Sequence, residues 1–215
     1  MIEEVSSTAT IGREKLTTDL KQSSLGVPLP LSLKQILSEL SVPCFKVADH
    51  NHQECIKLLQ DINPDLIVLG DTRILKQGIL NIPKDGIINV HPGYLPDVKG
   101  NNPYIWSIIY DLPLGCTVHF IDTGVDTGPI IKRQKIFLER EKYFPDLLVE
   151  INSLCGELLV DSLKQISSGL VKSINQSELA RETSEVRTFR LASPAIKALA
   201  VEKLEKGTYL HLVSV

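Results

Sequence analysis

The strongest constraint on the fold is the apolar run PDLIVLG at residues 64–70, which has turn residues on both sides. A continuous apolar run of this length is typical of a strand that is covered on both faces in a parallel sheet. GIINV at 86–90 has the same character, and apolar residues at helical spacing precede the first run in LSLKQILSEL at 31–40 and NHQECIKLLQDI at 51–62. Helices that alternate with buried strands predict an α/β fold.

The downstream sequence predicts further elements of a layered fold. PYIWSIIY at 103–110 predicts a helix, and two strand-like runs at 115–122 and 128–138 are joined by a turn segment, which favours an antiparallel pair. From Pro145 to about Ser168 the apolar residues recur on one side, as in an amphipathic helix that packs on a sheet. We therefore predict a three-layer, Rossmann-like α/β domain with a mixed, mostly parallel sheet and helices on both faces.

The length of 215 residues, with 43% hydrophobic content, suits one substantial core and is too short for two full domains. Residues 1–30 show no sustained period, so we expect an atypical, loosely structured amino end. We assign residues 31–175 to the main domain, with VPCFKV at 42–47 as a short strand. The polar stretch that follows predicts a small carboxy-terminal tail subdomain at 176–215, with one helix near 194–205 and an apolar end that would suit a homodimer surface.

The charge balance argues against a nucleic-acid partner. The net charge is −3, from 23 basic and 26 acidic residues, and no basic run is dense enough to follow a line of phosphates. No stretch approaches the roughly 18 apolar residues of a membrane span, and the first residues, MIEEVSSTAT, are acidic and polar where a secretory signal is basic and then apolar. We expect a cytoplasmic protein that binds neither nucleic acid nor membrane.

The four cysteines predict no metal site. Cys44, Cys55, Cys116 and Cys155 are widely separated and show neither CxxC pairs nor the His spacing of a zinc site. Each has the surroundings of a small core residue, and Cys116 lies within an apolar run, where burial is a better interpretation than nucleophilic chemistry.

The residues with the clearest chemical potential lie at strand ends, where open α/β sheets place their ligand sites. Asn89 and His91 are two apart at the end of one strand, so they point to the same face, and Asp126 lies in the turn after another strand. An amide can donate a hydrogen bond to a developing oxyanion, an imidazole can move protons, and a carboxylate can orient the imidazole or accept a proton from an attacking amine.

Structural interpretations compete with this one. His91, next to a proline, has the setting of an ordinary loop histidine, Asn89 that of a turn residue, and DTGVDTG at 122–128 that of an Asx-rich turn. His119 alternates with apolar residues in a strand, so a buried structural role competes evenly with a supporting role near Asp126.

Three blocks of the sequence resemble the folate-dependent formyltransferases. They are PDLIVLGDTRIL at 64–75, GIINVHPGYLPDVKGNNPYIWSI at 86–108 and GCTVHFIDTGVDTGPII at 115–131. The resemblance implies the formyltransferase fold, 10-formyltetrahydrofolate as the formyl donor, an amine as the acceptor and no metal.

The resemblance also assigns roles to individual residues. Asn89 and His91 occupy the family's catalytic amide and imidazole positions, Asp126 its catalytic acid position, and His119 that of a supporting histidine. The segment 69–75 and the loop 121–126 resemble the walls that hold the pterin, largely through backbone groups. The cofactor-binding residues implied are Leu69, Gly70, Arg73, Leu75, Ile121, Thr123 and Val125.

The stretch KGNNPYIWSIIYDLPLG at 99–115 is most similar to the sugar N-formyltransferases and to the formylation domains of peptide synthetases. It lacks the Gly-x-x-Ala-His version of the glycinamide ribonucleotide enzymes, and the acidic chain has no basic carboxy-terminal domain of the kind usual in tRNA enzymes. A small amine, such as an amino sugar linked to a nucleotide, is the expected acceptor. Glycinamide ribonucleotide or methionyl-tRNA formyltransferase, a formyltetrahydrofolate hydrolase and a non-catalytic folate-binding remnant are the alternatives.

The expected mechanism combines these roles. An uncharged amine attacks the formyl carbon, Asn89 and a protonated His91 stabilise the oxyanion, and Asp126 helps to pass a proton towards the departing folate nitrogen. Residues 1–30 contain no apolar strand followed by a phosphate-facing loop, a departure from most of the family. We expect either that the acceptor is held differently or that the chain is a shortened form with a compromised substrate site.

Overall fold

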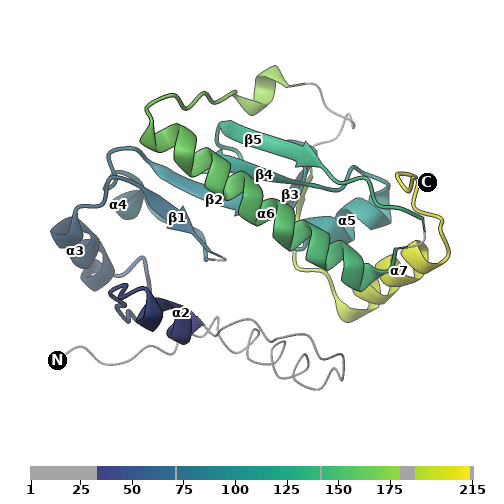
Figure 1. The fold of residues 1–215 in the computed structure, drawn as a ribbon, viewed down its shortest axis with the longest axis horizontal. Helices are drawn as coiled ribbons and strands as arrows, with labels where there is room; N and C mark the ends of the chain where they lie inside the picture. The colour runs from purple at the N-terminus through teal and green to yellow at the C-terminus, as the bar shows by residue number, and fades with distance from the viewer. Residues whose placement is uncertain (1–32, 71, 141, 180–186, 214–215) are drawn as a thin grey trace. The chain divides into compact units, whose positions relative to one another are not determined.

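The computed structural model describes residues 33–213 apart from 71, 141 and 180–186 (Figure 1). These residues divide into two compact units. Residues 33–62 and 72–75 form one unit, and residues 63–70 together with the described residues from 76 onwards form the other. The predicted amino-end segment 1–30 lies outside the described residues.

The first unit contains helices α2 (Leu33–Glu39) and α3 (Gln53–Ile62). The strand expected at 42–47 is wrong, because these residues join no β-ladder in the structure. A strand forms only where a neighbour completes its backbone hydrogen bonds, and here the Val42 N–H instead caps α2 by donating to the carbonyl oxygen of Leu37 (2.9 Å). The prediction that every cysteine is a core residue fails in the same segment, since Cys44 is exposed.

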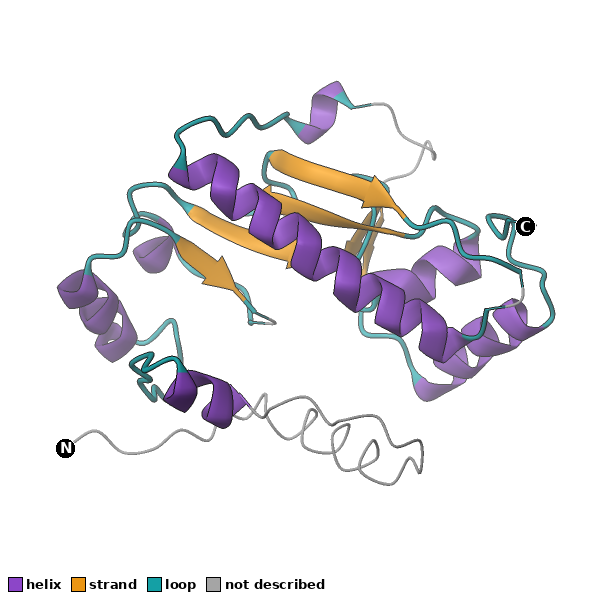
Figure 2. Cartoon of the chain, viewed as in Figure 1, coloured by secondary structure: helices purple, strands orange, loops and turns teal. Residues whose placement is uncertain are grey.

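The second unit is built on a four-stranded sheet in the order β1-β2-β4-β5, confirming the α/β class and the mixed sheet (Figures 1 and 2). The strands are β1 (Ile67–Leu69), β2 (Ile87–His91), β4 (Gly115–Phe120) and β5 (Ile130–Lys135). β1 runs parallel to β2, whereas β2 with β4 and β4 with β5 are antiparallel. The antiparallel pair predicted from 115–138 is therefore confirmed.

Strand β1 departs from its expected environment. The apolar run 64–70 was interpreted as a strand covered on both faces, but only Ile67–Leu69 joins the sheet, and Val68 is 41% exposed. Within the described residues β1 is an edge strand, and α4 (Gln77–Leu80) lies between β1 and β2 in the sequence. An edge strand has a strand partner on one side only.

The long helix α6 (Phe144–Ser167) crosses the front of the sheet in Figures 1 and 2 and confirms the amphipathic helix expected from Pro145. Its start is capped, because Asp146 accepts a hydrogen bond from the Tyr143 N–H (2.9 Å). Helix α5 (Pro103–Tyr110), predicted with the same bounds, contributes to the same core. The core includes Ile88, Val118, Ile105, Ile108, Leu147, Ile151 and Leu158.

The chain after α6 contains η1 (Gln176–Glu178), β6 (Arg187–Phe189) and the predicted helix α7 (Pro194–Glu205). Strand β6 pairs in parallel with β3 (Val98–Gly100) to form a second, two-stranded sheet. Helix α7 packs on α5, and its Lys203 ammonium lies 2.6 Å from the carboxylate of Asp111 at the end of α5. Residues 176–215 as a separate subdomain remain a prediction.

Candidate active site

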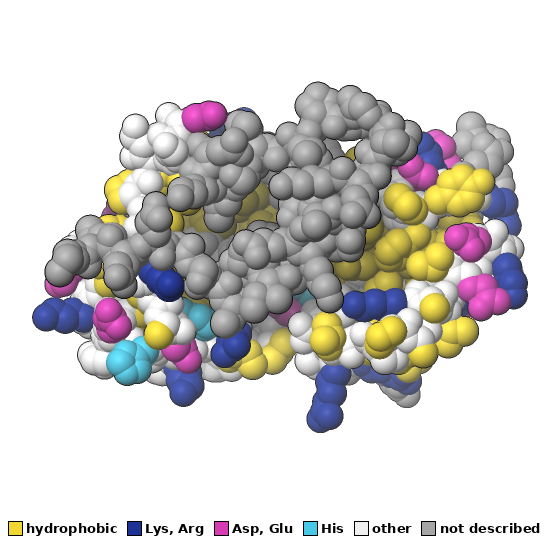
Figure 3. Space-filling model, turned by 90° about the horizontal axis from the view of Figure 1, so that it is seen from below, with side chains coloured by type: hydrophobic (Ala, Val, Ile, Leu, Met, Phe, Trp, Pro, Cys, Tyr) yellow, Lys and Arg dark blue, Asp and Glu magenta, His cyan; other side chains and the backbone are white. Residues whose placement is uncertain are grey.

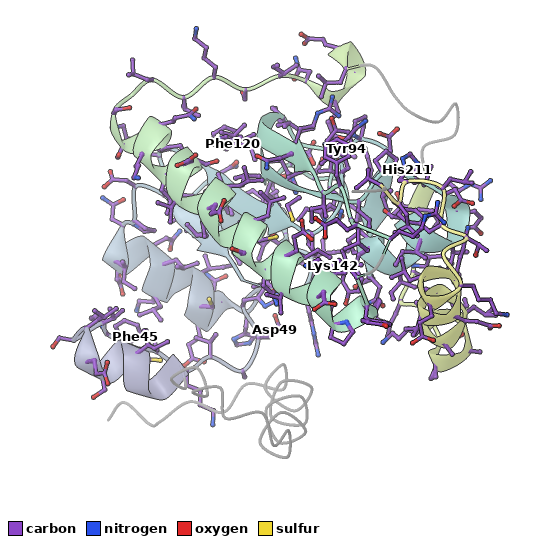
Figure 4. All side chains as sticks on the ribbon, turned by 45° about the vertical axis from the view of Figure 1, so that its right-hand side comes forward. Phe45, Asp49, Tyr94, Phe120, Lys142 and His211 are labelled. Atoms are coloured by element: carbon purple, nitrogen blue, oxygen red, sulfur yellow. The ribbon has the colours of Figure 1, made fainter. Side chains whose placement is uncertain are left out.

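The two faces of the β2–β4 pair differ in chemistry. In the antiparallel register Ile88 lies opposite Phe120 and Val90 opposite Val118, and these apolar side chains face the core under α6. The residues between them, Asn89 opposite His119 and His91 opposite Thr117, point to the other face. Phe120 and Tyr94, labelled in Figure 4, mark the two ends of this region: Phe120 ends β4, and the Tyr94 ring lies beside Gly115 at its start. The candidate site therefore lies on the face away from α6.

His91 ends β2 and is held in place by its neighbours. Its Nε2 atom lies 2.9 Å from the carbonyl oxygen of Val98, and because a carbonyl only accepts, Nε2 carries the hydrogen. The Nδ1 atom is left to face Asp126. Gly93 is required nearby, because a Cβ atom there would lie 2.6 Å from Nε2 of His91 and 2.6 Å from Pro103 Cβ. The imidazole is consequently fixed in position and buried.

Asp126 brings the predicted catalytic residues together. Its Oδ2 atom accepts a hydrogen bond from the Gly100 N–H (2.7 Å) and lies 3.6 Å from Nδ1 of His91. Its Oδ1 atom lies 3.6 Å from Nε2 of His119, which is itself 3.4 Å from the side-chain nitrogen of Asn89. The structure thus groups Asn89, His91, His119 and Asp126 in one cluster, and their catalytic roles remain predictions.

The charges in the cluster are set by burial and by these contacts. Burial acts to raise the pKa of Asp126, but the His119 and His91 imidazoles and the Gly100 N–H outweigh it and lower the pKa to about 2. Burial lowers the pKa of His91 and outweighs the opposing effect of Asp126 and of the Val98 carbonyl. At neutral pH the carboxylate is ionised and His91 is neutral. This lowered pKa favours a neutral imidazole over the protonated His91 of the expected mechanism, and the role of His91 stays a prediction.

The loop 121–126 has the geometry of an Asx turn, as the structural interpretation of DTGVDTG anticipated. The Asp122 carboxylate accepts hydrogen bonds from the Gly124 N–H (3.0 Å) and from the Thr127 hydroxyl (2.5 Å). The same turn also places Asp126 beside His91 and His119. A structural role for the turn is therefore compatible with a functional role for Asp126.

The predicted folate-binding residues divide between the two units. Ile121, Thr123 and Val125 lie in the loop before Asp126, and Leu69 and Gly70 lie at the end of β1, all in the unit that carries the cluster. Arg73, which is exposed, and Leu75, which is buried, belong to the other unit. The structure therefore does not place these two with the remaining five.

The sequence interpretation missed several supporting groups. The Thr117 hydroxyl donates to the Gly93 carbonyl (2.8 Å) and accepts from the Leu95 N–H (3.1 Å), which fixes the turn after His91. The backbones of Val98 and Gly100 hold His91 and Asp126. Of these groups only Thr117 could have been found from the sequence, because it is two residues from His119 on β4 and so faces the same side. Contacts made by backbone atoms cannot be predicted from residue type.

Within the described part of the chain, no group of three or more His, Cys, Asp or Glu side chains is arranged to hold a metal ion. None of the described helices combines the length and the apolar character that crossing a membrane requires. On the face shown in Figure 3, Lys and Arg side chains are interspersed with acidic and hydrophobic ones.

Comparisons with known proteins match the sequence to one family. The family model for formyl transferase matches residues 11–162. Methionyl-tRNA formyltransferase of Kosmotoga olearia is 31% identical over 146 residues, which cover 67% of this chain and 47% of that protein. The Clostridium acetobutylicum protein of the same name is 30% identical over 170 residues, which cover 77% of this chain and 55% of that protein.

Solved structures show the same fold. The formyltransferase PseJ from Anoxybacillus kamchatkensis, in complex with UDP-4,6-dideoxy-4-formamido-L-AltNAc and tetrahydrofolate, has a TM-score of 0.61 at 23% identity and covers 83% of this chain and 96% of its own. The N-formyltransferase from Helicobacter canadensis, in complex with folinic acid and dTDP-3-aminofucose, has a TM-score of 0.59 at 20% identity and covers 90% of this chain and 71% of its own. These likenesses confirm the Rossmann-like formyltransferase fold.

The chain spans about half the length of the curated relatives it matches. The family model nevertheless covers most of the 215 residues, including the strands and the loop that carry Asn89, His91, His119 and Asp126. The chain therefore belongs to the formyl transferase family.

Proposed function

We propose that this protein transfers a formyl group from 10-formyltetrahydrofolate to the amine of a small molecule. The observation that carries the proposal is the cluster on the polar face of the β2–β4 pair. There, the ionised Asp126 carboxylate lies 3.6 Å from a nitrogen of each of the two imidazoles, beside the amide of Asn89. A hydrogen-bond donor, a neutral imidazole and a carboxylate are the groups that attack on a formyl carbon requires.

The proposed reaction begins with attack of the uncharged amine on the formyl carbon. As the new C–N bond forms, the carbonyl electron pair moves to oxygen, and the Asn89 amide donates a hydrogen bond to the oxyanion. The Asp126 carboxylate, directly or through water, accepts the proton lost by the attacking nitrogen, and the neutral His91 is placed to share it. The C–N bond to the folate then breaks, and the proton passes to the departing folate nitrogen.

The donor would lie against the backbone of two segments. Leu69 is the last residue of β1 and Gly70 follows it, and Ile121, Thr123 and Val125 lie in the loop between β4 and Asp126. Tetrahydrofolate in PseJ and folinic acid in the Helicobacter protein support folate as the donor class.

An amino sugar linked to a nucleotide is the proposed acceptor. The solved structures support it, since PseJ and the Helicobacter protein bind nucleotide-linked sugars and PseJ is covered almost completely. The charge of −3 supports it as well, because a tRNA partner favours a basic protein. Methionyl-tRNA is the second candidate, favoured by the curated relatives.

The experiment mixes the purified protein with 10-formyltetrahydrofolate, alone and with nucleotide-linked amino sugars or methionyl-tRNA, and follows tetrahydrofolate release by absorbance. Tetrahydrofolate release that requires an amino sugar supports the proposal. Release only with methionyl-tRNA would show that methionyl-tRNA, and not an amino sugar, is the acceptor. Release without any amine identifies a hydrolase. Folate binding without release overturns catalysis in favour of a binding remnant. Asp126→Asn serves as the inactive control, and Asp161→Asn, at a half-exposed aspartate on α6, serves as the matched active one.

A further inference from the structure

The segment that follows α6 returns to the loop of Asp126. Ile174 and Ile130 exchange two backbone hydrogen bonds, each 2.9 Å long, so residue 174 lies directly beside the first residue of β5. Two residues later, Gln176 begins η1. Gln176 is the first residue of the predicted tail subdomain, and its side chain is buried, with 6% of the residue exposed.

The Gln176 amide binds both ends of the segment 126–128. Its Nε2 atom donates to the carbonyl oxygen of Asp126 (2.9 Å) and to that of Gly128 (2.9 Å). Because both partners can only accept, the orientation of the amide is fixed: a flipped amide would place Oε1 against two carbonyl oxygens. One side chain therefore uses both of its N–H groups on the backbone that presents the catalytic carboxylate.

This backbone needs external support. Asp126 has a φ of +51°, a left-handed conformation that a residue other than glycine adopts at an energetic cost and keeps only where its surroundings hold it. Gly128 also lies close to the end of β4, because a Cβ atom there would lie 1.9 Å from the Phe120 carbonyl oxygen. Phe120 and Gln176 therefore both contact the segment.

We propose that Gln176 is a positioning residue that sets the location and the ionisation of the Asp126 carboxylate. It acts through the backbone of Asp126 and Gly128. A carboxylate that moves away from His91, His119 and the Gly100 N–H loses the contacts that stabilise its charge. The proposal rests on the proposed function for its kinetic consequence, and its ionisation consequence can be measured without any substrate.

The test compares Gln176→Met, which keeps the length and removes both donors, with Glu178→Gln as a matched control. Glu178 lies on the same turn, is exposed and accepts a hydrogen bond from Asn175 (2.7 Å), away from the loop. We expect Gln176→Met to lower kcat by about 10- to 100-fold, since misplacement of a reacting group by about 1 Å costs this much. The acidic limb of its pH–kcat profile should also move to higher pH, because the displaced Asp126 protonates more easily. Glu178→Gln should match the wild type.

Carbon-13 NMR titration of the Asp126 carboxyl separates this proposal from the transferase proposal, because it needs no turnover. We expect the pKa of Asp126 to rise in Gln176→Met and, less strongly, in Gln176→Asn, which keeps the amide on a shorter arm and serves if the methionine variant does not fold. An unchanged Asp126 pKa in the folded variant, or a pH-independent loss of kcat, would overturn the positioning role. A raised pKa in a protein that transfers no formyl group would uphold the positioning role and refute only the transferase.

Discussion

The two faces of the β2–β4 pair are made by alternate residues of the same strands, yet they serve different purposes. Ile88 faces the core under α6 and is fully buried, whereas its neighbour Asn89 faces the cluster with His119 and Asp126. Because successive side chains point in opposite directions, one strand supplies packing and chemistry at adjacent positions. Stability and activity should therefore respond separately to substitutions one residue apart.

The largest effect on stability is expected on the apolar face. Ile88→Ala removes buried methyl groups and leaves a cavity under α6, so we expect the free energy of unfolding to fall by about 2–5 kcal/mol. Denaturant unfolding measures this directly. The kcat of the fraction that remains folded should stay near the wild-type value. A loss of kcat as large as that of Asn89→Ala would break the separation of the two faces.

At Asn89, one residue after Ile88, we expect a change of comparable size in the reaction barrier and not in stability. Asn89→Ala removes the proposed oxyanion donor and should raise the barrier by about 2.7–4 kcal/mol, which corresponds to a turnover reduced about a hundredfold or more. His91→Ala should behave similarly, and Asp126→Asn should be at least as damaging because it removes the charge. Steady-state kinetics and thermal unfolding should be measured on the same preparations. Near-normal turnover with a lowered melting temperature would show that Asn89 is structural.

The pH dependence of stability gives a smaller effect from the polar face. The folded pKa of Asp126 is lowered to about 2 from an ordinary value of 3.8, so its charged form stabilises the fold above pH 4, and this contribution is lost as the pH falls towards 2. At about 1.4 kcal/mol for each pH unit, the contribution is about 2 kcal/mol. The stability difference between the wild type and Asp126→Asn, measured by urea unfolding, should shrink over this range. A stability difference that stays constant between pH 4 and 2 would contradict the lowered pKa of Asp126.

The smallest effect is expected for the ion pair at the edge of the apolar face. Lys132 on β5 lies 2.5 Å from Asp161 on α6, and both side chains are more than a third exposed. Lys132→Ala should therefore change the free energy of unfolding by less than about 1 kcal/mol, and less still in high salt. Calorimetry at two salt concentrations checks this. A loss as large as that of Ile88→Ala would mean that the edge of the sheet is as important as its core.

Helices and strands were predicted most accurately from the sequence where the pattern of apolar residues is local. The helix at 103–110 appears with the same bounds, and the strands at 115–122 and 128–138 appear with shorter ones, because apolar alternation and helical spacing are properties of neighbouring residues. The expected strand at 42–47 failed because a strand also needs a partner, which local sequence does not encode.

The candidate site shows the same division. The sequence by itself determined that Asn89 and His91 share a face, because strand alternation requires it, and three motif blocks indicated the family to which the chain belongs. Only the tertiary structure decided which groups hold His91 and Asp126: the carbonyl of Val98 and the N–H of Gly100 come from β3, and the amide of Gln176 comes from η1. Two of these are backbone atoms that every residue carries, and the third lies 50 residues beyond Asp126. Such contacts depend on how distant segments pack, and so does the burial that lowers the pKa of His91, because neither is a property of local sequence.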